Sequence, residues 1–272
     1  GHTGVKVDDA LMAKLPKLRI IGNFGVGYDS VDAAAAGKRG IIVTNTPDVL
    51  TEEVADTTLG LLLMTVRELS QAERWLREGK WATEGDYPLT QASLRDRSVG
   101  ILGMGRIGMA IARRLEAFAV PVSYCARHRR ENLSYPYYPT AVELAKAVDT
   151  LIVITPGGPE TRNIVDAAVL EALGPRGILI NMARGTCVDE QALINALRNR
   201  TIHAAGLDVF LNEPRINPEF LTLPNTVLLP HVGSASVHTR NKMGQLVVDN
   251  LKAYLERKPP LTPVPETPFK GW

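Results

Sequence analysis

A glycine-rich motif that directly follows an apolar run constrains the fold of this chain more than any other feature. The motif Gly103–Gly108 has the sequence GMGRIG, the run Ser98–Leu102 precedes it, and apolar residues then recur at helical spacing from Ile107 to Phe118. In a strand–turn–helix unit the first glycine permits a tight turn, the second admits a pyrophosphate, and the third packs helix against strand. The N–H groups at the start of such a helix attract phosphate. We therefore expect a dinucleotide site that includes Gly103, Gly105, Arg106, Ile107 and Gly108.

The middle of the chain alternates strand-like runs with helical patterns. The runs are apolar throughout and rich in Val, Ile and Leu, which is typical of strands buried on both faces of a parallel sheet. Apolar residues between the runs recur at helical spacing, as Val169 and Leu173 do. This alternation predicts an α/β fold with a Rossmann-type doubly wound parallel sheet. The predicted strands are Ser98–Leu102, Val120–Cys125, Thr150–Ile154, Gly177–Ile180, Ala204–Val209 and Thr226–Leu229.

A second, smaller α/β region precedes this one. The runs Leu18–Ile21 and Gly40–Val43 flank a short helical pattern at Val31–Ala36. Since the chain begins with Gly1 rather than Met, we expect the natural start to lie upstream and this smaller domain to begin before Gly1. The Pro-rich tail, Pro259–Pro268, predicts an extended surface arm.

One long helix is expected between the two regions. Thr51 suits its N-cap, Gly79 suits its end, and Thr51–Glu78 should form a single helix. Its middle, Leu59–Val66, is apolar nearly all round, so it should be buried inside the domain or against a second subunit. Trp81 belongs either to a pocket or subunit interface, or to the core as a helix-end aromatic.

Composition narrows the classes of partner. The net charge of +2 offers no basic field for nucleic acid or an anionic membrane. No apolar run approaches the roughly 18 residues of a membrane helix. The two cysteines are too few for a disulfide framework and fit a reducing, cytoplasmic compartment. The histidines show no metal-site spacing, so we expect no metal.

The end of the second predicted strand bears on which dinucleotide binds. An NAD site places Asp or Glu about 20 residues after the glycine motif, where it holds the ribose 2′-hydroxyl. Here Tyr124–Arg130 has the sequence YCARHRR, and no carboxylate occurs before Glu131. The guanidinium of Arg127 suits a 2′-phosphate, with Arg129 or Arg130 assisting. We therefore expect NADPH/NADP in preference to NADH/NAD; the alternative is a solvated arginine cluster.

Chemically active side chains gather after three consecutive predicted strands. Ligands bind at the carboxyl ends of strands in open α/β sheets, and topology brings Arg184, Asp208, Glu213 and His231 towards that edge. Reduction of a 2-keto acid needs a cation for the carboxylate and an acid that protonates the keto oxygen as hydride arrives. Arg184 can bind the carboxylate, and His231 can act as the acid. Glu213 can orient the imidazole and favour its protonated form. Asp208 either caps a turn or orients a nicotinamide amide.

Together these motifs resemble the D-isomer-specific 2-hydroxyacid dehydrogenases over nearly the whole chain. Gly157 and Gly158 depart from the Leu-Thr that is usual in the family's third-strand loop. The matching stretches are Asn45–Pro47, Val54–Asp56, Gly103–Gly108, Pro156 with Glu160 and Thr161, Asn181–Gly185, Gly206–Phe210 with Glu213 and Pro214, and Pro230–Ser234.

The resemblance implies a catalytic trio of Arg184, Glu213 and His231, and a homodimer formed through the cofactor domain. It also implies a smaller flavodoxin-like substrate domain, incomplete here, of residues 1–47 with 237–272, and a cofactor domain of residues 48–236. It implies further cofactor contacts from Thr155, Pro156, Thr161, Met182, Ala183, Asp208, Gly233 and Ser234, besides Arg127 and Arg130. It implies substrate contacts from Gly25, Val26 and Gly27, and from a second loop that ends in His2, Thr3 and Gly4.

Within the family, the stretches Tyr124–Arg127 and Tyr137–Thr140 resemble NADPH-dependent glyoxylate and hydroxypyruvate reductases. These stretches imply reduction of a small 2-keto acid to the D-2-hydroxy acid. One alternative keeps the trio but takes 2-ketogluconate or an aryl pyruvate. Another, of a different class, is a nucleotide-sensing corepressor that binds the dinucleotide without turnover.

Overall fold

The computed structural model describes residues 6–272, and the chain folds into two compact units. The second unit runs from Val54 to Gly233, and the first unit takes the residues up to Glu53 and from Ser234 onward. The division therefore falls inside the helix α3 (Thr51–Val66) rather than ahead of it, where the sequence suggested. The first turn of α3 belongs to the first unit because the Glu53 carboxylate accepts a hydrogen bond from the Thr239 hydroxyl, 2.9 Å away.

The second unit is built on one parallel sheet of seven strands in the order β5-β4-β3-β6-β7-β8-β9. All six predicted strands are present, and most of their residues are fully buried. The short edge strand β5 was not predicted; it pairs Tyr137 with Tyr124 and Tyr138 with Cys125. The strands are β3 (Val99–Leu102), β4 (Val122–Cys125), β5 (Tyr137–Tyr138), β6 (Thr150–Val153), β7 (Ile178–Asn181), β8 (Ala204–Leu207) and β9 (Thr226–Leu228).

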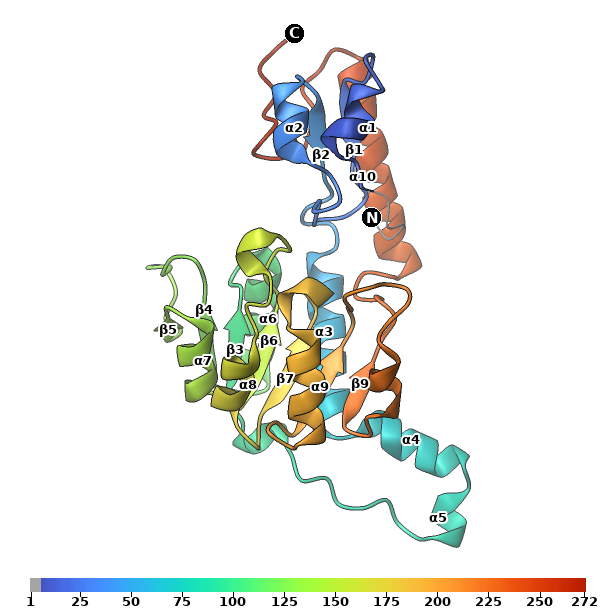
Figure 1. The fold of residues 1–272 in the computed structure, drawn as a ribbon, viewed down its shortest axis with the longest axis vertical. Helices are drawn as coiled ribbons and strands as arrows, with labels where there is room; N and C mark the ends of the chain where they lie inside the picture. The colour runs from blue at the N-terminus through green and yellow to red at the C-terminus, as the bar shows by residue number, and fades with distance from the viewer. Residues whose placement is uncertain (1–5) are drawn as a thin grey trace. The chain divides into compact units, whose positions relative to one another are not determined.

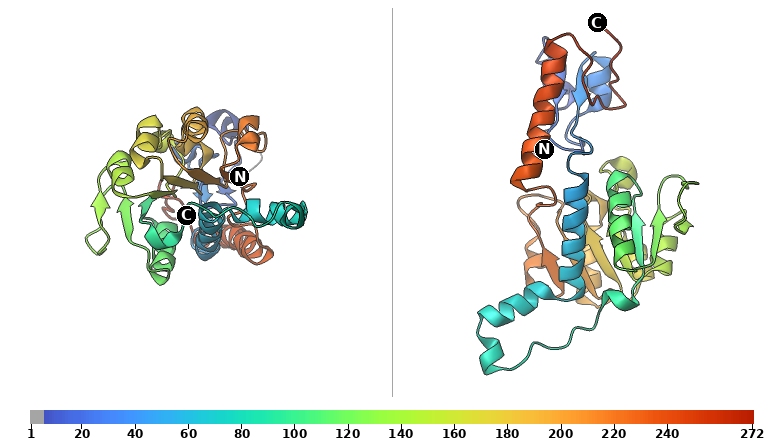
Figure 2. Two further views of the ribbon diagram at one scale, coloured as in Figure 1. Left: turned by 90° about the horizontal axis from the view of Figure 1, so that it is seen from below. Right: turned by 180° about the vertical axis from the view of Figure 1, so that it is seen from behind.

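Helices cover both faces of this sheet, as expected for a doubly wound fold (Figures 1 and 2). One face carries α7 (Ala141–Ala147), α8 (Ala167–Leu173) and α9 (Glu190–Arg198), whose apolar residues join the strands in one core cluster. The other face carries α3 and α6 (Arg106–Ala117). Helix α3 packs closely on β8, since a Cβ atom at Gly206 would lie 2.4 Å from the Thr65 hydroxyl oxygen. Parallel strands therefore place all their carboxyl ends at one edge.

The predicted single helix over Thr51–Glu78 is wrong: two helices occupy this stretch. Helix α3 ends at Val66 and α4 (Leu69–Arg77) follows, because Glu68 adopts the left-handed conformation with a φ of 51°. The Glu68 carboxylate accepts a hydrogen bond from the Tyr87 hydroxyl at 2.8 Å. This tertiary contact supports the break. The helix end predicted at Gly79 is confirmed, with a φ of 73° there.

An arm follows, which we define as residues 69–93. It comprises α4, α5 (Lys80–Thr83) and an extended segment that leads back to the sheet (Figure 1). Neither helix has a buried residue. Trp81 is 60% exposed, so its placement in the core is wrong. The predicted burial of Leu59–Val66 holds for Leu59, Leu61, Leu62 and Val66.

The first unit contains a two-stranded parallel sheet of β1 (Ile20–Gly22) and β2 (Ile42–Thr44), close to the predicted runs. Its helices are α1 (Asp9–Ala13), α2 (Ala33–Lys38) and α10 (Val237–Leu255). Helix α2 begins where the Asp32 carboxylate accepts the Ala35 amide hydrogen bond at 2.8 Å. Helix α10 packs on β1, since a Cβ atom at Gly22 would lie 2.9 Å from a Val247 methyl carbon.

The Pro-rich tail is not the surface arm that its composition suggested. The Val264 amide donates to the Val43 carbonyl at 2.9 Å, and the Val264 side chain is 2% exposed. The buried Thr267 hydroxyl accepts from the Val43 amide at 2.9 Å. The tail therefore packs along β2, because the Val264 backbone amide and the Thr267 hydroxyl pair with the backbone groups of Val43.

Candidate functional site

The glycine motif forms the turn between β3 and α6 that the sequence predicted. Gly103 has a φ of 110°, which L side chains rarely adopt. A Cβ atom at Gly108 would lie 2.2 Å from the Gly103 carbonyl oxygen, so only glycine allows the helix to start here. No side chain caps the amino end of α6, and a Cβ atom at Gly105 would meet nothing within 4 Å. An uncapped helix start beside open space fits a pyrophosphate.

The loop after β4 presents Arg127 on a braced backbone. The Tyr124 side chain is fully buried, and its hydroxyl accepts the Arg130 amide hydrogen bond at 2.8 Å. The Tyr137 hydroxyl donates to the Ala126 carbonyl at 3.3 Å. Arg127 itself pairs with Glu160, Nη2 to Oε2, at 2.8 Å. Arg127 thus lies directly after β4 on a fixed loop, and the 2′-phosphate contacts expected of Arg127 and Arg130 both stay predictions.

The loop after β6 carries the predicted Thr155, Pro156 and Thr161. The Thr161 hydroxyl donates to the Pro156 carbonyl at 2.7 Å, which fixes the short 3₁₀ turn η2 (Pro159–Thr161). The Thr155 hydroxyl lies 3.5 Å from the sulfur of Cys187, which is fully buried. These contacts order the loop beside the glycine turn, because β6 is the neighbour of β3.

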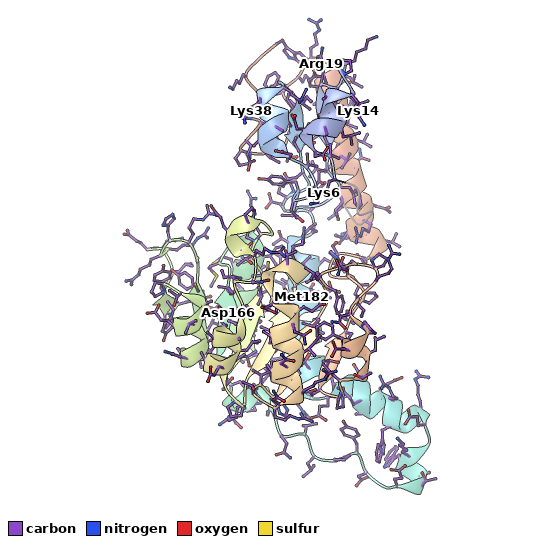
Figure 3. All side chains as sticks on the ribbon, in the orientation of Figure 1. Lys6, Lys14, Arg19, Lys38, Asp166 and Met182 are labelled. Carbon is purple, nitrogen blue, oxygen red and sulfur yellow. The ribbon has the colours of Figure 1, made fainter. Side chains whose placement is uncertain are left out.

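The arginine motif lies at the carboxyl end of β7. The Asn181 side chain holds the turn at both ends: its Oδ1 accepts from the Ala183 amide, and its Nδ2 donates to the Arg184 carbonyl, each at 3.1 Å. Met182, labelled in Figure 3, directly follows the strand and is buried. A Cβ atom at Gly185 would lie 1.9 Å from the Phe210 carbonyl carbon. The Arg184 loop therefore lies directly against the loop after β8.

That neighbouring loop brings Glu213 to His231, which follows β9. The His231 Nδ1 lies 2.7 Å from one Glu213 carboxylate oxygen, and the other oxygen accepts the Phe210 amide hydrogen bond at 2.9 Å. Both side chains are about one-quarter exposed, at 24% and 25%. Because a carboxylate only accepts, Nδ1 carries the hydrogen in this contact, and Nε2 is the ring nitrogen that does not face Glu213. The predicted pair of Glu213 and His231 is formed.

Asp208 caps the turn that carries His231. Its two carboxylate oxygens accept the amide hydrogen bonds of Val232 at 2.7 Å and Gly233 at 2.8 Å. The residue is 2% exposed, and burial raises the pKa of Asp208, while these two amides act in the opposite direction. Of the two roles proposed for Asp208, the structure shows the cap. Its contact with a cofactor stays a prediction.

The remaining predicted residues lie elsewhere. Gly233 is buried in the second unit, and its carbonyl accepts the Thr57 hydroxyl hydrogen bond at 3.2 Å, whereas Ser234 is the first residue beyond the division. Ala183 is 3% exposed in the arginine motif. His2, Thr3 and Gly4 lie outside the described residues.

The predicted substrate loop, Gly25–Gly27, belongs to the first unit. Asn23 donates to the Gly25 and Gly27 carbonyls, both at 3.0 Å, and Asn45 donates to the Val26 carbonyl at 2.9 Å. These two amide side chains, which sequence reasoning missed, fix the loop. Its substrate contacts stay a prediction.

Glu160 is a second residue whose position sequence reasoning missed. The sequence places it only in the loop after the third predicted strand, whereas the structure brings its carboxylate to Arg127. The one signal in the sequence was Tyr124, three residues before Arg127, whose hydroxyl could have indicated a fixed loop there. No signal in the sequence could pair residues 127 and 160.

Within residues 6–272, no group of three or more His, Cys, Asp or Glu side chains is arranged to hold a metal.

The site's parts are those that hydride chemistry on a keto acid requires. The glycine turn and Arg127 suit the pyrophosphate and 2′-phosphate of a dinucleotide. The cation of Arg184 and the imidazole of His231, oriented by Glu213, follow strands at the same sheet edge, where a keto acid would need a cation and a proton donor.

Comparison with known proteins agrees with this geometry. A family model described as "D-isomer specific 2-hydroxyacid dehydrogenase, NAD binding domain" matches residues 59–233. Among solved structures, the NADPH-dependent glyoxylate/hydroxypyruvate reductase of Sinorhizobium meliloti, crystallised with NADP and malonate, superposes with a TM-score of 0.95. It is 60% identical, over 97% of this chain and 83% of that one.

Three curated relatives are similar over nearly the whole chain. Glyoxylate/hydroxypyruvate reductase A of Arabidopsis thaliana is 48% identical over 97% of this chain and 84% of its own length. Hydroxyphenylpyruvate reductase of Plectranthus scutellarioides is 47% identical with the same coverage. The 2-ketogluconate reductase of Gluconobacter oxydans (strain 621H) is 45% identical over 96% of this chain and 84% of its own length.

Proposed function

Because the chain belongs to the D-isomer-specific 2-hydroxyacid dehydrogenase family, we propose that it reduces a small 2-keto acid, of the glyoxylate or hydroxypyruvate type, to the D-2-hydroxy acid with NADPH. The observation that carries the proposal is the 2.7 Å contact between His231 and Glu213, on a loop packed against that of Arg184. Acid, orienting carboxylate and cation thus share the carboxyl edge of β7, β8 and β9.

When bound, the nicotinamide cofactor supplies the hydride. The residues of this chain bind and polarise the keto acid that receives the hydride. Arg184 binds the substrate carboxylate through a planar, bidentate guanidinium and draws electron density towards the keto oxygen. His231 holds a proton on Nε2 and transfers it to that oxygen, while Glu213 keeps the ring in place through Nδ1. In the reverse direction His231 accepts the hydroxyl proton.

NADPH is the preferred cofactor. The S. meliloti relative is named as NADPH-dependent and was crystallised with NADP. In this chain, Arg127 occupies the end of β4, where an NAD site would carry an acidic residue. The glycine turn, Arg106 and Ile107 at the start of α6, and the loops with Thr155, Pro156, Thr161, Met182 and Ala183 complete the proposed cofactor site.

The named relatives are reductases, which favours turnover over the nucleotide-sensing alternative. Two of them act on larger acids by name, hydroxyphenylpyruvate and 2-ketogluconate. The similarity to glyoxylate/hydroxypyruvate reductases places the small acids first. Aryl pyruvates and 2-ketogluconate are the alternative substrates.

We further propose that the enzyme is a homodimer. The arm exposes Leu69, Leu76, Trp81 and Leu89, at 46%, 56%, 60% and 92%. Apolar surface of this kind suits burial against a second copy.

Among the described residues, none of the helices has the length and apolar character that a membrane span needs. The cysteines Cys125 and Cys187 are buried and unpaired, which supports a reducing, cytoplasmic location. The small net charge of +2 speaks against a nucleic-acid partner.

The test is loss of nicotinamide absorbance with NADPH and with NADH, each against glyoxylate, hydroxypyruvate, hydroxyphenylpyruvate and 2-ketogluconate. We expect kcat/KM to be highest with NADPH and one of the two small acids. A larger acid as the best substrate would replace the substrate assignment and keep the reaction. Tight NADPH binding without turnover on any acid would contradict the proposal.

A further inference from the structure

An exposed ion pair joins the loops on either side of the glycine turn. Arg127 Nη2 lies 2.8 Å from Glu160 Oε2, and each side chain is 76% exposed. Arg127 follows β4 and Glu160 lies in η2 after β6, and these two strands flank β3, whose end starts the glycine turn. The pair therefore lies at the part of the carboxyl edge that receives the adenosine half of a dinucleotide.

Both members of the pair are held by their own loops. The Tyr124 and Tyr137 hydroxyls brace the backbone on either side of Arg127. The Thr161 hydroxyl donates to Pro156 and ties down the turn that carries Glu160. Because each loop is fixed independently, the approach of the two charges follows from the fold. At such exposure the pair contributes little to the stability of the fold. Its effect should instead be on the affinity of Arg127 for another anion.

We propose that Glu160 is a specificity-determining residue that competes with the cofactor's 2′-phosphate for Arg127. This inference rests on the proposed use of NADPH. A 2′-phosphate carries nearly two negative charges at neutral pH, so it must displace the Glu160 carboxylate to bind Arg127 and then lies near that like charge. NADH presents only a neutral hydroxyl there and is indifferent to the competition. Glu160 thus lowers the affinity for NADPH and leaves that for NADH nearly unchanged.

The first test is the dissociation constant of each cofactor, titrated by nicotinamide fluorescence, for Glu160→Gln. We expect NADPH to bind about three- to fivefold more tightly, the range of an exposed charge pair, and NADH to change by less than about twofold. The gain should shrink in about 0.5 M salt, because exposed charges are screened at high ionic strength. Glu171→Gln makes the same charge change on the exposed side of α8 and should leave both constants unchanged.

Two variants of Arg127 separate this inference from the function on which it rests. Arg127→Ala should weaken NADPH selectively, and adding Glu160→Gln to it should give no further gain. If Arg127→Ala weakens NADPH and NADH equally, the proposed 2′-phosphate site itself is wrong. If Arg127→Ala weakens NADPH alone but Glu160→Gln binds NADPH no more tightly than the parent protein, the competition is overturned and the 2′-phosphate site stands.

Discussion

The Nδ1 atom of His231 lies 2.7 Å from the Glu213 carboxylate, although the two residues stand 18 positions apart in the chain. His231 has a φ of 55°, in a region that non-glycine residues seldom occupy. Such a backbone persists only where its surroundings hold it. Glu213 holds the ring, and Asp208 holds the two amides that follow. The imidazole is therefore fixed with Nδ1 towards Glu213, and in the proposed mechanism Nε2 carries the transferred proton.

Removal of the imidazole tests the proton donor. His231→Ala should lower kcat by about 10² or more, because a positioned acid contributes that much to the rate. The dissociation constant of NADPH should remain within about twofold of the parent value, since binding does not use the acid. The matched control is His238→Ala, which removes an exposed histidine and should leave kcat unchanged. An unchanged kcat for His231→Ala would make His231 structural.

Replacement of the Arg184 guanidinium by an ammonium tests whether Arg184 binds the substrate carboxylate. Arg184→Lys keeps the charge but loses the fork that binds a carboxylate through two hydrogen bonds. We expect kcat/KM for the keto acid to fall by about 10²-fold or more, with the affinity for NADPH retained. Steady-state kinetics with varied keto acid measure this. If only the affinity for NADPH fell, Arg184 would be a cofactor-binding residue and not a substrate-binding one.

Asp208→Asn tests the cap under His231. An asparagine offers one acceptor oxygen, so its amide nitrogen would oppose one of the two N–H donors of Val232 and Gly233. An unpaired buried donor costs about 1–3 kcal/mol, and displacement of the imidazole should lower kcat about tenfold. Kinetics and thermal melts should change together. A variant that melts earlier yet keeps the parent kcat would show that the cap supports the fold without positioning His231.

His203 gives the protein a pH-dependent stability. Burial lowers the pKa of His203, and the positive charge of Arg97 acts in the same direction. The unfolded chain therefore takes up this proton first, so the stability contribution is present above about pH 6.5 and is lost as the pH falls through the lowered folded value. The Tm of His203→Gln should fall less between pH 7.5 and 5.5 than that of the parent, and His238→Gln should fall as the parent does. Equal falls for all three proteins would refute the assignment.

The parts of the fold that follow from local patterning were predictable from the sequence. Strand β7 is apolar from Ile178 to Ile180, with only its last residue, Asn181, polar, and the turn at Gly103 requires a backbone that glycine supplies. The same logic located Arg184 and His231, because parallel strands deliver their following residues to one edge. Residue type then indicated the chemistry.

The features that escaped prediction depend on contacts distant in sequence. Neither Gly nor Pro marks Glu68, and its helix break is supported by Tyr87, 19 residues on. The tail at Val264 has a composition typical of a surface arm but pairs with Val43. Glu160 reaches Arg127 only because β4 and β6 flank β3. Periodicity carries no information about such pairings.

The most direct test of the central claim is the fate of a labelled hydride. The enzyme is incubated with hydroxypyruvate and with NADPH that carries two deuterium atoms at nicotinamide C4. The enantiomers of the product are separated on a chiral column, and their deuterium content is measured by mass spectrometry. We expect D-glycerate that carries one deuterium at C2. Formation of L-glycerate, or of glycerate without deuterium at C2, would contradict the proposed reaction.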